Sequence, residues 1–431
     1  MKFINDFFNL SNLGTSIQKE VVAGITTFLA MAYIIVVNPS MLSDTGMDFG
    51  AVFVATCLAA AIGSILMGVL GNYPIAQAPG MGQNAFFTYA VVLGMGYTWQ
   101  VALGAVFLSG IIFIILSLLP VREWLINSIP LNLKLGMSAG IGLFLGVIAL
   151  KNAGIVVDNP ATLVSLGDMQ AFSSIVCLFG FVLIVSLAAK KVTGAVIFGI
   201  LATTLLGWAF GDVHIDGIVS MPPSPAPVFL QLDIAGAFQV SMVTVIITLL
   251  LVDVFDTAGT LVGVATRANM LDEKGRLPRL GKALLSDSGA TSIGALLGTS
   301  STTSYIESSA GVEAGGRSGL TAVVAGLLFL LALWFVPIVK SIPPYATSAA
   351  LLFVAVLMTR SLSLVDWDDL SESAPAALAA VTMPLTFSIS DGIGLGFISY
   401  ALIKIFTGQY RQCPAAVYVI AVIFTGKYLF L

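Results

Sequence analysis

Charged side chains are scarce in this sequence. Of its 431 residues only 9% are Asp, Glu, Lys or Arg, whereas 58% are hydrophobic, and the mean hydropathy is +1.02. A soluble globular domain carries about 25% charged residues, so this composition excludes that class and predicts a polytopic membrane protein in a lipid bilayer. The 18 Lys and Arg against 22 Asp and Glu leave a net charge of −4, and no dense basic cluster is present. Nucleic acid is therefore excluded as a partner.

Cysteine and histidine are also rare. Cys57, Cys177 and Cys413 lie far apart in or beside apolar stretches, without the spacing of a zinc site or a disulfide framework. The single histidine, His214, lies in a polar loop. No GxxxxGK followed by Ser or Thr occurs, so the sequence predicts neither an ATP-binding pump nor a bound cofactor or metal. The N-terminus lacks the pattern of a secretory signal peptide, and none is expected to be removed.

Long apolar runs fill most of the chain. At about 20 residues per span, the sequence predicts seven segments near 20–37, 49–71, 81–93, 99–120, 132–150, 171–189 and 194–211. After a polar, proline-rich loop at 212–235, seven more are predicted near 236–265, 283–298, 304–315, 318–339, 345–361, 374–389 and 391–407. An apolar tail at 414–431 is left over, and its topology stays open.

The distribution of Lys and Arg orients these segments. With a cytoplasmic N-terminus, alternation leaves only Lys151, Lys340 and, depending on the tail, Lys427 outside. The loops at 38–50 and 212–233 carry no Lys or Arg and also fall outside. We therefore expect a multi-pass protein of the plasma (inner) membrane. The residues placed inside with Lys2 and Lys19 are Arg122, Lys134, Lys190, Lys191, Arg267, Lys274, Arg276, Arg279, Lys282, Arg317, Arg360, Lys404 and Arg411.

Two segments are too interrupted to be ordinary spans. They are residues 71–87, GNYPIAQAPGMGQNAFF, and residues 298–316, GTSSTTSYIESSAGVEAGG, and each is the third element of its group of seven. Unsatisfied backbone cannot face lipid, so such breaks must lie within protein or line a cavity. Interrupted segments at matching positions of two halves indicate a transporter site between inverted repeats.

Three carboxylates lie within these apolar regions. Asp253 and Asp256 are three residues apart in LVDVFDTAGTLVGVA, so they share a helix face, and Glu307 lies at the start of the second half-helix. An ionisable group inside a membrane segment costs about 2.5 to 3.5 kcal/mol and usually serves a cavity, a partner or a transport path. A close carboxylate pair can bind and release a proton, as a proton-coupled carrier requires. Which aspartate does so, and whether the other only accepts hydrogen bonds, stays open.

Uncharged polar groups accompany the carboxylates. Asn84 in the first break offers a donor and an acceptor, although an amide there can equally cap local backbone. Thr27 in the first span can add a hydroxyl to the same cavity or bond back onto its own helix. Phe86 and Phe87 can stack on a flat ring, but aromatics at this spacing more often pack between helices.

Four ordered motifs resemble one family from end to end. GITTFLAMAYIIVVNP, APGMGQNAFF, DVFDTAGTLVGVA and TTSYIESSAGVEAGGRSGL are similar to the azaguanine-resistance-type (AzgA-like) purine permeases of the nucleobase/ascorbate transporter superfamily. The resemblance implies a uracil-permease-like, all-α fold of about 14 spans in two inverted seven-span repeats, 1–211 and 236–431. It also implies a core domain, about 20–120 and 236–339, and a gate domain, about 132–211 and 345–431.

The same resemblance implies the site. Short strands, roughly 75–78 and 300–303, open the broken third and tenth segments, and the nucleobase binds between them. Glu307 resembles the carboxylate that holds the purine, and Asn84 the amide that reads it. Asp253 and Asp256 match two acidic positions of the eighth span, with Asp256 on substrate and Asp253 in proton handling or packing as one assignment.

The leading hypothesis is a secondary active transporter that imports a purine nucleobase with protons and forms a homodimer in the bilayer. Hypoxanthine, guanine and adenine are not distinguished. One alternative is a carrier of another small polar or anionic solute on the same fold, although three acidic residues disfavour an anion. Another is an intramembrane aspartyl protease, because Asp391 in SDGIGLG faintly resembles a GxGD-type loop, but the order of its motifs is wrong. The chain is thus not expected to be an enzyme.

Overall fold

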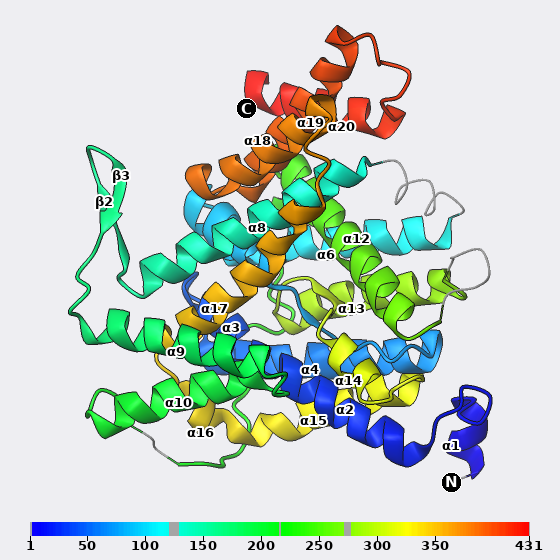
Figure 1. The fold of residues 1–431 in the computed structure, drawn as a ribbon, viewed down its shortest axis with the longest axis vertical. Coiled ribbons are helices and arrows are strands. Elements are labelled where there is room, and N and C mark those ends of the chain that lie inside the picture. Colours follow the sequence, from blue (N-terminus) through cyan, green and yellow to red (C-terminus); the bar gives the residue numbers. More distant parts are fainter. Residues whose placement is uncertain (1, 120–128, 215–216, 271–276, 431) are drawn as a thin grey trace.

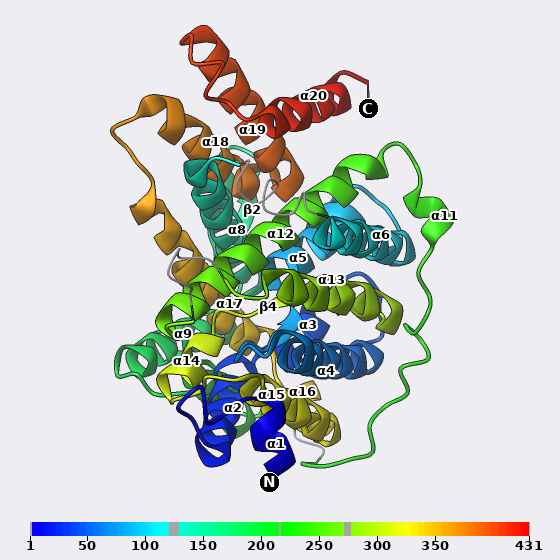
Figure 2. The same ribbon diagram turned by 90° about the vertical axis from the view of Figure 1, so that its right-hand side faces the viewer.

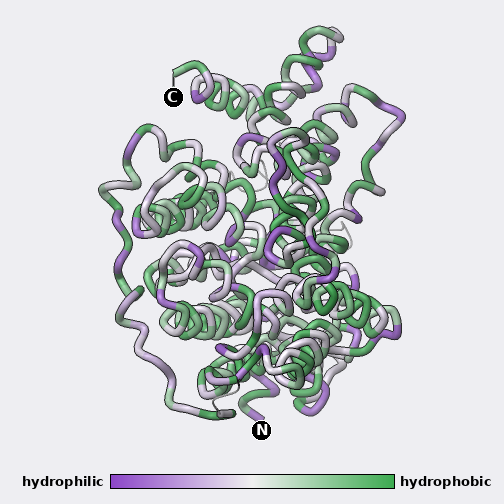
Figure 3. The backbone as a smooth tube through the Cα atoms, turned by 90° about the vertical axis from the view of Figure 1, so that its left-hand side faces the viewer, coloured by the Kyte–Doolittle hydropathy of each residue, from purple (hydrophilic) through white to green (hydrophobic). Residues whose placement is uncertain are grey.

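The computed structural model describes residues 2–119, 129–214, 217–270 and 277–430. Within these ranges, nine helical segments are long and apolar enough to cross a membrane, and two further apolar helices, α10 and α20, are shorter. Figure 3 shows that most helices are hydrophobic along their length, whereas hydrophilic residues gather in the connections. The nine segments are Ile17–Ser43, Phe49–Gly71, Trp99–Leu118, Leu131–Asn152, Phe172–Ala189, Met242–Arg267, Gly319–Lys340, Pro344–Leu364 and Ile389–Phe406.

The elements follow the predicted order (Figure 1). The first half contains α1 (Lys2–Phe7), α2 (Ile17–Met31), α3 (Ile34–Ser43), α4 (Phe49–Leu66), the π-helix η1 (Met67–Gly71), β1 (Gln77–Pro79), α5 (Met81–Ala85), the π-helix η2 (Phe86–Gly94), α6 (Trp99–Leu118), α8 (Leu131–Asn152), β2 (Val156–Asn159), β3 (Leu163–Leu166), α9 (Phe172–Ala189) and α10 (Ala195–Ala209).

The second half contains α11 (Ile234–Ala237), α12 (Met242–Arg267), α13 (Leu280–Leu297), β4 (Thr302–Ser304), α14 (Ser308–Glu313), α15 (Gly319–Ala332), the 3₁₀ helix η3 (Leu333–Phe335), α16 (Val336–Lys340), α17 (Pro344–Thr359), the 3₁₀ helix η4 (Arg360–Leu364), α18 (Leu370–Thr386), α19 (Ile389–Phe406) and α20 (Ala415–Phe430).

The helices pack mainly within two groups. In one group α13 packs between α4 and α6, α15 packs against α4 and α2, and α12 packs against α6 (Figure 2). In the other, α8 packs against α17 and α18, α9 packs against α10 and α17, and α18 packs against α19, which carries α20. Contacts such as those of α5 with α8 and of α12 with α19 join the two groups.

The two predicted breaks meet at the centre of the fold. Strands β1 and β4 pair antiparallel, with Gln77 opposite Ser304 and Pro79 opposite Thr302. All six strand residues are buried, so the pairing satisfies backbone groups that neither lipid nor a neighbouring helix could bond. Each strand then leads into a short helix, α5 or α14. Paired strands in the third and tenth segments are confirmed, each about two residues later than expected.

Some elements differ from the prediction. The first span continues to Ser43, with a tight turn at Ala32 and Tyr33 that divides it into α2 and α3. The loop after α8 forms the hairpin β2–β3, which projects from the body in Figure 1 and which no motif of the sequence predicts. Helix α18 begins at Leu370 rather than near 374, because the Asp369 side chain caps its first turn.

The tail forms α20, which packs on α19 through a 2.8 Å ion pair between Lys427 and Asp391. At 16 residues it is shorter than most spans, and the count of about 14 spans stays a prediction. Arg122, Lys274 and Arg276, which entered the predicted topology, lie outside the described residues.

Candidate functional site

The paired strands β1 and β4, which we call the strand frame, hold the two breaks together. Besides the β1–β4 pairing, the Gly80 amide donates to the Ser301 carbonyl at 2.9 Å, and the Tyr305 amide donates to the Ala76 carbonyl at 3.0 Å. The Tyr305 hydroxyl also donates to the Pro79 carbonyl at 2.6 Å. These bonds run from one break to the other, so they fix the starts of α5 and α14 relative to each other.

Glu307 lies at the N-terminal end of α14, as the sequence predicts. Its half-buried carboxyl accepts a hydrogen bond of 2.5 Å from the Tyr33 hydroxyl, which the turn between α2 and α3 brings to it. The position also places the carboxylate near the free N–H groups of a helix start, which stabilise negative charge.

Asp256 faces the same place from the middle of α12. Its side chain is exposed, and its carboxyl lies close enough to Glu307 to interact with it electrostatically. The buried Gln83 amide of α5 interacts with the Asp256 carboxyl. Two carboxylates and an amide therefore converge where the two breaks meet.

Asn84 is turned toward the opposite break. Its side-chain oxygen accepts a hydrogen bond from the Ser300 hydroxyl, and its Nδ2 has no partner within the described part of the chain. Asn84 thus joins the two breaks while keeping one donor available. Phe86 and Phe87 are buried in η2, among the packed side chains of the core.

Asp253 lies apart from Asp256, on the side of α12 that faces α13. It is buried, and its Oδ2 accepts a hydrogen bond of 2.9 Å from Thr291, whereas its Oδ1 has no donor among the residues described. Its carboxyl interacts electrostatically with that of Asp287 on α13. The sequence spacing predicts that both α12 aspartates share a face, whereas the fold gives them different surroundings: Asp253 is buried against Thr291 and Asp256 is exposed.

Asp287 holds the strand frame together. Its Oδ1 accepts hydrogen bonds from the Gln77 amide at 2.9 Å and the Ser304 hydroxyl at 2.7 Å, so it ties β1 to β4. Its Oδ2 accepts from Thr257 of α12 at 2.6 Å. One fully buried carboxyl therefore connects both breaks with α12 and α13.

Thr27 lies at the contact between α2 and α14. Its buried hydroxyl packs where a Cβ on Gly311 would clash with it, and the hydroxyl has no partner among the described residues. This places Thr27 behind the half-helix that carries Glu307.

Three residues around the site escaped the sequence reasoning: Tyr33, Gln83 and Asp287. Asp287 in LSDSGATS is an ionisable residue inside an apolar helix and meets the same criterion that singles out Asp253. Gln83 directly precedes Asn84, and one step of about 100° along a helix decides which amide faces Asp256. Tyr33 carries no signal, because only the turn after α2 brings it to Glu307.

In the described ranges, no three His, Cys, Asp or Glu side chains gather as a metal site would require. None of the ion pairs formed by described residues involves Asp256 or Glu307. The arrangement can accept N–H donors from a small polar ligand and can take up a proton.

Comparison with known proteins gives matches over nearly the whole chain. A family model described as the Permease family matches residues 18–395. The chain is 52% identical to a putative permease of Methanocaldococcus jannaschii, covering 100% of this chain and 99% of that protein. It is 50% identical to the adenine permease AdeP of Escherichia coli (98% and 95% covered) and 46% identical to the guanine/hypoxanthine permease PbuG of Bacillus subtilis (99% and 99% covered).

Solved structures share the fold at low identity. The transmembrane domain of the cyanobacterial bicarbonate transporter BicA aligns with a TM-score of 0.66 at 15% identity, covering 86% of this chain and 96% of that one. The murine anion transporter Slc26a9 in its inward-facing state aligns with a TM-score of 0.69 at 10% identity, covering 94% and 72%. These likenesses confirm the predicted fold class and carry no information on substrate.

Proposed function

This chain belongs to the permease family, as a multi-pass membrane transporter rather than an enzyme, and from that premise we propose that it imports purine nucleobases with protons. The candidates are adenine and the 6-oxopurines guanine and hypoxanthine, because relatives named for each are about equally similar to it. The membership of an azaguanine-resistance-type group, read from four motifs, agrees with these relatives. Membership of the permease family also excludes the alternative of an intramembrane aspartyl protease.

One observation carries the proposal: the carboxyls of Asp256 and Glu307 interact electrostatically at the paired breaks, and neither forms an ion pair among the described residues. Purines present N–H groups along an edge, and a carboxylate can accept two of them in charge-assisted hydrogen bonds. In our proposal Glu307 holds the base, Asp256 accepts from a second edge, and the amides of Gln83 and Asn84 read the exocyclic group. Thr27 supports α14 from behind.

The same pair supports proton coupling. Two neighbouring carboxylates repel each other when both are ionised, so one of them binds a proton most favourably when the other binds substrate. We assign proton uptake to Asp256 and Glu307. We also propose that Asp253, which lies beside Asp287, is a buried carboxyl that can accept the proton in their place. An anion would meet uncompensated negative charge here, which disfavours an anionic solute.

Transport requires the site to open alternately to either side. We propose that the core domain, about 20–120 and 236–339, carries the breaks and moves against the gate domain, about 132–211 and 345–431. The exposed face of α12 runs from Asp256 through Gly259 to Val262, and a Cβ on Gly259 would meet nothing within 4 Å. This supports a passage from the site toward the end of α12 that holds Arg267. An inner-membrane location, a cytoplasmic N-terminus and a homodimer complete the proposal.

The test is uptake of labelled adenine, guanine, hypoxanthine and uracil into cells that lack their own nucleobase permeases. We expect concentrative purine uptake that an uncoupler abolishes, and little uracil uptake. Glu307→Gln should remove high-affinity purine binding by the purified protein without lowering its melting temperature. If the protein reaches the membrane and accumulates no purine, the substrate assignment is wrong; if uptake is concentrative but insensitive to the uncoupler, only the proton coupling is wrong.

A further inference from the structure

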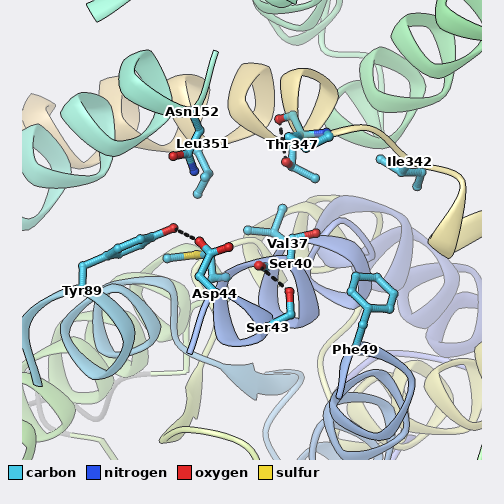
Figure 4. A pocket seen from close by; sticks show the side chains of 12 residues that line it. Val37, Ser40, Ser43, Asp44, Phe49, Tyr89, Asn152, Ile342, Thr347 and Leu351 are labelled. Carbon is cyan, nitrogen blue, oxygen red and sulfur yellow. Dashed lines mark hydrogen bonds between the residues drawn. The ribbon is translucent and has the colours of Figure 1, made fainter. Parts of the chain in front are cut away.

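A cavity lies between the two helix groups, away from the breaks. It has a volume of about 230 Å³ and opens at the end of α3, where the 38–50 loop is predicted to be extracellular. One wall comes from α3, α4 and η2, and the other from the end of α8 and the start of α17 (Figure 4).

The polar groups of this cavity differ in how much hydrogen-bonding capacity they have left for a ligand. The hydroxyls of Ser40, Ser43 and Thr347 donate to backbone carbonyls of their own segments at 2.8 to 2.9 Å, so they present only lone pairs. Asp44 accepts one hydrogen bond, of 2.8 Å from the Tyr89 hydroxyl to its Oδ2. The Asn152 amide, from the opposite wall, faces Tyr89. One carboxylate oxygen and one amide are therefore the groups with most capacity left for a ligand.

The surroundings of Asp44 limit which ligand fits. Partial burial raises the pKa of its carboxyl, while the Tyr89 hydroxyl and the charge of Lys151 counteract that rise. A metal ion prefers several oxygen charges, whereas this cavity has one carboxylate. An anion would be repelled by the carboxylate. A neutral, flat molecule with N–H donors satisfies both constraints.

The apolar lining suits a flat ring. Phe49 and Met41 on one wall and Leu351 and Ile342 on the other enclose the polar groups. Drug-sized ligands occupy roughly 300 to 1,000 Å³, so a cavity of about 230 Å³ matches a smaller molecule, the size of a single bicyclic base. The cavity thus shares with the inner site a carboxylate and an amide.

We propose that this cavity is a second, weaker binding site for the transported nucleobase, in which Asp44 accepts its N–H groups before it reaches Glu307. The inference rests on the proposed purine transport. Since its walls belong to different helix groups, the site exists only while those groups stay close on this side. The base therefore leaves it when the domains move.

The experiment is equilibrium binding of labelled adenine and hypoxanthine to purified protein in nanodiscs, from micromolar to millimolar concentration. In the Glu307→Gln background, we expect a saturable weak site to remain. Adding Asp44→Asn should weaken that site about tenfold, the loss of one charge-assisted hydrogen bond. Adding Asp158→Asn, which removes an equal charge from the exposed hairpin on the same side, should leave it unchanged.

Initial uptake rates give a second reading. Asp44→Asn alone should raise KM for external purine several-fold while the affinity of the inner site is kept. Two results would overturn the inference while leaving the inner site intact. In one, the Glu307→Gln protein binds no purine at all; in the other, its weak binding is unchanged when Asp44→Asn is added. No binding to the unsubstituted protein would instead refute the purine assignment itself. If Asp44→Asn does not fold, Asn152→Leu on the facing wall is the replacement, with the same expected loss.

Discussion

We predict that the pairing of β1 with β4 depends on the carboxyl of Asp287. Its carboxyl accepts three hydrogen bonds, from Gln77, Ser304 and Thr257, inside a fully buried region. Asp287→Ala leaves all three donors without that acceptor, and a buried unsatisfied donor costs about 1 to 3 kcal/mol. We therefore expect a loss of about 3 kcal/mol or more from a total stability of about 5 to 15 kcal/mol.

Asp287→Asn is the matched control. Its amide oxygen can replace Oδ1 toward Gln77 and Ser304, and the Thr257 hydroxyl can reverse to accept from the new NH₂ group. The expected loss is only about 1 to 2 kcal/mol, because charge-assisted bonds become ordinary ones. The two variants should therefore differ clearly in stability although both remove the charge.

The buried thiols Cys57, Cys177 and Cys413 provide the assay, because a thiol-reactive dye labels them only as the protein unfolds. We expect the melting temperature to fall in the order unsubstituted protein, Asp287→Asn, Asp287→Ala. Adenine affinity should fall in the same order, since β1 and β4 lead directly into α5 and α14. An Asp287→Ala protein that melts and binds like the unsubstituted one would refute the reasoning.

Three further substitutions, each with a control variant, test contacts elsewhere in the fold. Gly319→Ala puts a Cβ against a backbone oxygen of η1 and should cost about 2 to 3 kcal/mol, measured by the same melt, whereas Gly289→Ala has open space and should be neutral. Lys404→Met breaks the 2.8 Å ion pair with Glu372 and should cost about 2 kcal/mol, because Glu372 is partly exposed; adding Glu372→Gln should restore part of the loss. Asp48→Ala removes the cap of α4 and should lower stability by about 1 kcal/mol, and Asp48→Ser should keep most of it.

The amino-acid sequence alone determined the class of the protein and the position of its breaks. A chain so poor in charge has to satisfy its backbone internally, and residues such as Pro79 and the Ser and Thr run before Glu307 cannot continue a helix there. Helix bounds therefore agree with the predicted ones within a few residues for most segments. The family resemblance, read from four motifs, is confirmed.

Only the tertiary structure decided which side chains are neighbours in space. Asp253 and Asp256 look alike in sequence, but α13 covers one with Thr291 and Asp287, while the other faces Glu307 and Gln83. Tyr33 reaches Glu307 from 274 residues away, through a turn that no local motif announces. Helix periodicity fixes which residues share a face, but the neighbour of that face depends on packing between distant segments, and packing is a property of the whole fold.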